Sequence, residues 1–166
     1  VAGDDVAEEA RLDSLFAFYF CTLRNNGLTH EGEHYSAGAL REEAARSASE
    51  RLTRTTAAEY RATKRVNDLS VAERSLSALG AFEELLETSE TGFLLSRTEP
   101  SYVDLALLVE LLELAEDEHV PDFAEVFHLP KLGAFLETTR ARPRLDAYLR
   151  SPRRMPRYAR PGYVYV

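Results

Sequence analysis

The order of hydrophobic and polar residues follows the period of an α-helix along most of the chain. From position 4 to position 24, apolar residues recur every three or four positions, which predicts a first amphipathic helix. Residues 25–38 are rich in Asn, Gly and Ser and are typical of a loop. Residues 39–66 are rich in Ala, Glu and Arg with a thin apolar stripe, so we expect a long helix that projects beyond the compact body.

Two short motifs mark the starts of further helices. In Ser70–Glu73 and in Ser101–Asp104, a serine is followed three residues later by a carboxylate. This is the spacing of a capping box, in which the serine hydroxyl accepts from one backbone N–H and the carboxylate accepts from the N–H of the serine. The first box predicts a helix that ends near Thr88, and the second opens the most apolar segment of the chain.

That segment, from Tyr102 to Ala115, is interrupted only by Asp104, Glu110 and Glu113. It is too short for a bilayer, which needs roughly 20 apolar residues, so membrane insertion is not expected. Because unpaired buried charges are costly, we expect Glu110 and Glu113 to face outward or to meet arginines. A helix that is apolar on nearly every side is buried among others. Four leucines are therefore expected at the centre: Leu105, Leu108, Leu111 and Leu112.

Prolines organise the end of the chain. Pro130 and Pro143 are placed to open two short helices, since the first helical position needs no N–H donor. Further prolines at 152, 156 and 161 exclude a helix beyond them. The whole pattern predicts an all-α bundle over residues 1–154, with a long inserted or extended helix at about 26–66 and an irregular, basic, extended tail at 155–166.

Charge is divided unevenly between these parts. The net charge is −8, but Arg140 to Val166 hold eight Arg and one Asp, which is +7 and leaves −15 for the remainder. An acidic body argues against nucleic acid as a partner, because neutralised phosphates supply most of that affinity. The basic tail has two interpretations: it binds RNA or an acidic subunit, or it wraps its own acidic body.

Cys21 is the only cysteine, so no internal disulfide can form. This predicts a reducing intracellular compartment, the cytoplasm first and an organelle as the alternative. The thiol lies among the aromatic residues of the first helix and is expected to be buried and inert. His30 and His34 are four residues apart, but no helix fixes their spacing in the predicted loop, so a metal site is not expected.

The order of these elements resembles the C-terminal all-helical domain of the cytosolic glutathione S-transferases, with the sigma, mu and pi classes nearest. In that family the buried central helix begins with a Ser/Thr-x-x-Asp box, matched here by Ser101 and Asp104. The resemblance is good from Leu76 onward and poor across 26–66, and the usual Gly of the turn before the central helix is replaced near Ser96. A later motif of the family is matched by Pro130, Lys131, Leu132, Phe135, Arg142, Pro143, Ala147, Tyr148, Leu149 and Ser151.

The resemblance also bears on glutathione. In the family, glutathione is held mainly by a preceding thioredoxin-like domain, and no βαβ pattern precedes Asp4. We therefore expect the chain to be a piece of a longer protein, with no cofactor in this chain and glutathione only if a thioredoxin-like domain is present. The family's helical domain also lends an Asp to the glutathione amino group, one helical turn after the position matched by Asp13. That position is Ala17.

The resemblance further implies that the inner face of the first helix lines a pocket for an apolar electrophile. The candidates for this substrate-binding pocket are Phe16, Tyr19, Phe20 and Leu23. The alternative is that they pack the core or a dimer seam, which we favour because aromatic stripes at helical spacing are usually packing.

Two functions are consistent with these features. The first is a non-catalytic interaction or structural module of a larger assembly, which binds protein partners or a second copy through its first two helices. Ala17, the insertion and the basic tail favour it. The alternative is the helical half of an active glutathione transferase that conjugates glutathione to apolar electrophiles. In both, this chain supplies no catalytic residue.

Overall fold

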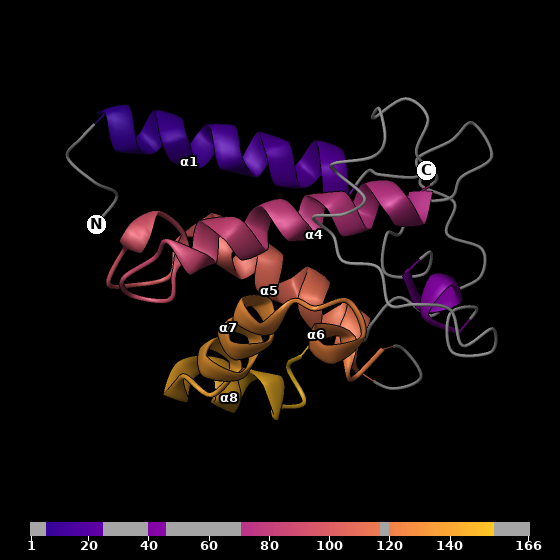
Figure 1. The fold of residues 1–166 in the computed structure, drawn as a ribbon. Coiled ribbons are helices and arrows are strands. Elements are labelled where there is room, and N and C mark those ends of the chain that lie inside the picture. The colour runs from indigo at the N-terminus through magenta and orange to yellow at the C-terminus, as the bar shows by residue number, and fades with distance from the viewer. Residues whose placement is uncertain (1–5, 25–39, 46–70, 117–119, 155–166) are drawn as a thin grey trace, which may run out of the picture.

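A computed structural model describes residues 6–24, 40–45, 71–116 and 120–154 of the chain (Figure 1). Every regular element within these ranges is a helix and none is a strand, which confirms the all-α prediction. Most of the predicted long helix at 39–66 and all of the tail at 155–166 lie outside the described residues. Residues 40–45 are helical, and Leu40 is buried in the core.

The first helix has two parts. α1 spans Val6–Tyr19 and continues without a break as the π-helix η1, Phe20–Arg24. It lies beside α4, Val71–Glu87 (Figure 1), and the ring of Phe18 is 5.4 Å from that of Phe82 on α4. α4 begins directly after Ser70 and ends next to Thr88, as the sequence predicts.

α5, Tyr102–Ala115, is the central helix. Leu108, Leu111 and Leu112 are buried as predicted, but the prediction for Leu105 was wrong because this side chain is 39% exposed. The reason is geometric. Tyr102, Leu105 and Val109 follow one another at steps of three and four residues, and this stripe is the one side of α5 that the described helices leave uncovered.

The C-terminal helices lie on the side of the molecule away from α1 (Figure 1). They are α6, Phe123–Val126, α7, Pro130–Arg140, and α8, Pro143–Leu149. Pro130 and Pro143 open α7 and α8, as predicted. None of the helices in the described ranges is long and apolar enough to span a bilayer.

The start of α7 is capped by another helix. Its N-cap residue, Leu129, has no side-chain acceptor, and the buried carboxylate of Glu83 on α4 takes that role. Glu83 accepts the N–H of Lys131 at 2.7 Å and the N–H of Leu132 at 2.8 Å. Burial raises the pKa of the Glu83 carboxyl, and the two N–H donors oppose that rise. Glu83 thus joins α4 to α7 through the orphan donors of a helix start.

Candidate functional site

α1 and η1 present two faces. Leu12, Tyr19 and Leu23 point into the core, whereas Phe16 and Phe20 are exposed. The four residues predicted for an apolar pocket are therefore divided, with Tyr19 and Leu23 in the core and Phe16 and Phe20 on the surface. Core packing explains why Tyr19 and Leu23 are apolar. It does not explain the exposed rings of Phe16 and Phe20.

Phe16 and Phe20 join the uncovered stripe of α5. The ring of Phe16 is 5.5 Å from that of Tyr102 in an edge arrangement and 6.3 Å from that of Phe20 in a stacked one. We define the α1–α5 strip as a set of five exposed apolar residues on α1, η1 and α5. They are Phe16 (38% exposed), Phe20 (45%), Tyr102 (45%), Leu105 (39%) and Val109 (56%).

One edge of the strip is acidic. The hydroxyl of Tyr102 donates a hydrogen bond to Asp13 Oδ1 at 2.5 Å, and Glu9 lies one helical turn before Asp13 on the exposed side of α1. The hydrogen bond to Asp13, with smaller contributions from desolvation and from the charges of Asp13 and Glu9, raises the pKa of Tyr102 to about 12. Tyr102 is therefore a neutral hydrogen-bond donor at physiological pH, with no readily formed phenolate.

A charged cluster lies where η1 meets α5. Arg24 Nη1 is 3.5 Å from Glu113 Oε2 and 3.7 Å from Glu110 Oε2. Glu110 is buried and also accepts from Tyr19, whose pKa is raised by burial and then by the nearby carboxylates. The expectation that these two acids meet an arginine is confirmed. Arg24 thus offsets part of the negative charge of the two carboxylates, of which that of Glu110 is buried.

A strained turn leads into α5. Residues Leu94–Ser96 form the 3₁₀-helix η3, in which Leu95 and Ser96 have left-handed φ values of 58° and 53°. This conformation costs an L residue roughly 1–2 kcal/mol. The Gly that is usual for this turn in the family that the sequence resembles is replaced near Ser96, and the backbone of Leu95 and Ser96 has the left-handed conformation that Gly adopts most easily.

Asp104 holds that turn in place. Its carboxylate is fully buried and accepts three hydrogen bonds, from Leu94 N–H at 2.9 Å, Ser101 N–H at 2.8 Å and Ser101 Oγ at 2.6 Å. Ser101 Oγ accepts in return from the Asp104 N–H at 3.3 Å. The predicted box at Ser101 and Asp104 is therefore present, and it has an additional donor in Leu94.

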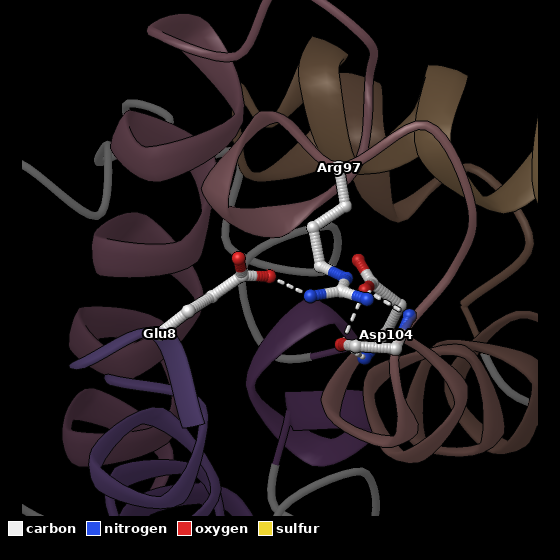
Figure 2. A network of polar contacts seen from close by, with 4 residues as sticks. Glu8, Arg97 and Asp104 are labelled. Atoms are coloured by element: carbon white, nitrogen blue, oxygen red, sulfur yellow. Dashed lines mark hydrogen bonds and ion pairs between the residues drawn. The ribbon is translucent and has the colours of Figure 1, made fainter. Parts of the chain in front are cut away.

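Arg97 extends this network to α1. Its guanidinium forms an ion pair with Glu8, and Figure 2 shows this pair beside the Asp104 carboxylate. The network joins three segments: the first turn of α1, the loop that contains η3, and the start of α5. These contacts fix the end of α1 that carries the acidic edge of the strip.

The remaining candidates fall in different places. Ser70 and the side chain of Glu73 lie outside the described part of the chain, as do His30 and His34. Ala17 is exposed on α1.

Cys21 is exposed, so the prediction of a buried thiol was wrong. Cys21 comes two residues after buried Tyr19, so it lies about 200° further around the helix axis. It therefore points away from the core and into solvent. In the described ranges, no three side chains of the types that hold metals come together.

Comparison with known protein families agrees with this architecture. Residues 49–152, more than half of the chain, match the family described as glutathione S-transferase, C-terminal domain. The chain belongs to this family. The matched region begins after α1, so it contains α5 and its capping box but only part of the strip. No match was found among curated proteins or among solved structures.

Sequence reasoning missed most of the strip. Tyr102, Leu105 and Val109 have a visible helical spacing, but a helix that is apolar on nearly every side gives no polarity contrast to show which side faces out. It also missed Glu83, because its partners lie 48 and 49 residues away in the sequence.

Proposed function

We propose that this glutathione S-transferase C-terminal domain acts as a non-catalytic interaction module in a larger assembly, with the α1–α5 strip as its binding surface. The observation that carries the proposal is the exposure of five large apolar side chains on two adjacent helices. Contiguous exposed apolar surface with a polar rim is typical of protein interaction sites.

The chemistry of the strip supports a protein partner. Phe16, Phe20 and Tyr102 supply aromatic area, which is enriched at the centres of protein interfaces. Glu9 and Asp13 form a charged edge that sets the orientation of a partner. A partner protein with an apolar centre and basic flanks fits this surface. A second copy of the chain, bound through the first helix and the segment at 39–66, is the alternative partner.

Two features of the chain are unfavourable for glutathione chemistry. By family resemblance, the carboxylate that would hold its amino group falls at Ala17, which cannot form an ion pair. The tyrosine of the strip, Tyr102, has its pKa raised to about 12 and already donates its hydroxyl hydrogen bond to Asp13, so it is poorly suited to stabilise a thiolate. Both features favour a binding role over a catalytic one.

The alternative function is the helical half of an active transferase. The observation in its favour is that Phe16 on α1 and Phe20 on η1 lie on the surface of the first helix, which family resemblance implies for the apolar electrophile. In that case a thioredoxin-like domain would bind glutathione and stabilise its thiolate, while the aromatic residues of the strip would contact the electrophile.

The test combines two measurements on the 166-residue chain. Calorimetric titration with glutathione and a conjugation assay with a generic aryl halide should show neither saturable binding nor turnover above the uncatalysed rate. Binding together with turnover would refute the module proposal. Sedimentation velocity with Phe16→Glu, and with Ala134→Glu on the exposed side of α7 as the matched control, would then show whether a second copy binds the strip.

A further inference from the structure

α8 lies on the surface of the bundle and contributes little to the core. None of its seven residues is buried, and only Leu145 and Leu149 pack partly against the core. Together with α7, it lies on the side of the molecule away from α1 (Figure 1). The outer side of α8 is therefore open to a partner that does not touch the α1–α5 strip.

α8 and the residues on either side of it are basic, although the whole chain has a net charge of −8. Residues 140–154 contain six arginines and one acid, Asp146. Arg144 and Arg153 are exposed, and neither has a carboxylate partner in the part of the chain that the structure describes. The other four arginines form ion pairs: Arg140 with Glu137, Arg142 with Glu99, Arg150 with Asp146 and Arg154 with Glu116.

The turn after α8 holds Arg153 in a defined place. Its N–H donates to Ser151 Oγ at 3.2 Å, the N–H of Arg154 donates to the Ser151 carbonyl at 3.0 Å, and the N–H of Ser151 donates to the Tyr148 carbonyl at 3.0 Å. The ion pair of Arg154 Nη2 with Glu116 Oε2, at 2.7 Å, joins the end of this turn to the C-cap of α5. Arg153 is thus presented from a turn that is fixed on both sides.

An exposed aromatic ring lies between these arginines in the chain. Tyr148 is 44% exposed and comes one helical turn after Arg144, so the two share one side of α8. The side chain of Arg150 is 80% exposed; its Nε donates to Asp146 Oδ1 at 2.8 Å, and its guanidinium has further N–H donors. We define the α8 basic surface as Arg144, Tyr148, Arg150 and Arg153. Arg and Tyr are among the residues that contribute most to the affinity of protein interfaces.

We propose that the α8 basic surface binds an acidic segment of a partner protein. The planar guanidinium groups of Arg144 and Arg153 pair with Asp or Glu through two parallel N–H donors, and the ring of Tyr148 packs against an apolar residue between those acids.

The charge of the whole molecule favours a short acidic segment over RNA. RNA is a long polyanion, and beyond the α8 basic surface it meets a molecule whose net charge is −8, which repels it. A short acidic segment contacts the basic surface alone. The inference goes beyond the proposed function and does not depend on it, because it leaves the α1–α5 strip exposed.

The test measures, by fluorescence anisotropy, how a labelled Glu-rich peptide with a central phenylalanine binds to the 166-residue chain. Binding should be saturable. Arg144→Glu and Arg153→Glu should each weaken it several-fold, and together by about tenfold or more. Tyr148→Ala should also weaken it several-fold, whereas Tyr148→Phe should keep the affinity, because the ring supplies the contact. Arg11→Glu makes the same change of charge on the exposed side of α1 and should leave the affinity unchanged. Circular dichroism controls for folding, since all these sites are exposed.

Several results would overturn the proposal. Absence of saturable binding is one, and an equal loss in Arg11→Glu and Arg144→Glu is another, because net charge alone would then determine the affinity. A loss confined to Arg157→Glu together with Arg160→Glu would show that those two residues bind the peptide instead. Oligouridylate of the same charge that binds more tightly than the peptide would make this a nucleic-acid surface. Phe16→Glu in the strip should leave peptide binding unchanged, so the proposed function is tested separately.

Discussion

Removing the Asp104 carboxylate is the sharpest test of how the central helix is held. The carboxylate is fully buried and accepts from the Leu94 N–H, the Ser101 N–H and the Ser101 hydroxyl. In Asp104→Ala both N–H groups stay buried without their acceptor, and each such group costs about 1–3 kcal/mol. The serine hydroxyl can rotate toward another acceptor and adds little. We therefore expect the free energy of unfolding to fall by about 3–5 kcal/mol, well above the roughly 1 kcal/mol that is typical of losing a helix cap.

Urea denaturation of the full chain, followed by circular dichroism at 222 nm, measures this loss. Asp104→Asn keeps the shape and one carbonyl oxygen, so about half of the loss should remain. Asp122→Ala is the matched control, since Asp122 is exposed and its side chain does not cap α6, and a change within about 0.5 kcal/mol is expected. A loss below about 1 kcal/mol in Asp104→Ala would refute the argument. It would show that the Leu94 and Ser101 N–H groups lose little free energy when the carboxylate is removed.

Three other predictions concern the packing and capping of the bundle. Because the pKa of buried Glu83 is raised, the folded state binds its proton more tightly than the unfolded chain, so the free energy of unfolding should fall as pH rises from 4.5 through the raised pKa. Glu83→Gln should remove that part of the pH dependence in urea titrations across this range. Gly133→Ala should destabilise the fold by about 1–3 kcal/mol, since the new Cβ would lie 2.7 Å from Ala124 Cβ, and Ala124→Gly should recover most of the loss in the double variant. Leu108→Ala should cost about 2–5 kcal/mol and Leu105→Ala under about 1 kcal/mol, and equal losses by thermal denaturation would contradict the exposure of Leu105.

Local signals in the sequence were reliable guides to the fold. The box at Ser101 and Asp104 and the prolines at 130 and 143 act within a few residues of themselves, and each opens a helix where expected. The start of α4 directly after Ser70 belongs to the same group. Helix starts could be predicted because capping is chemistry between neighbours in the chain.

Orientation and long-range contacts could not be predicted in the same way. Leu105 and Cys21 have apolar neighbours in the sequence, which predicted that both side chains are buried in the core. Apolar neighbours do not determine which side of a helix other helices cover, and both side chains are exposed. The contact of Asp104 with Leu94 spans ten residues and a left-handed turn, and that of Glu83 with Lys131 joins two helices. Such contacts exist only once the helices are packed, so no local pattern encodes them.

The cap that Glu83 provides for α7 has a consequence for the order in which the domain folds. The sequence at the start of α7 contains no side chain able to cap it, because Leu129 and Pro130 offer neither donor nor acceptor there. Until α4 docks, the first amides of α7 can be satisfied only by water, and the helix has little reason to begin at Pro130. α4 and α7 should therefore form in one cooperative step although 42 residues separate them. The amides of Lys131 and Leu132 are natural reporters of that step, since their hydrogen exchange should require the two helices to part.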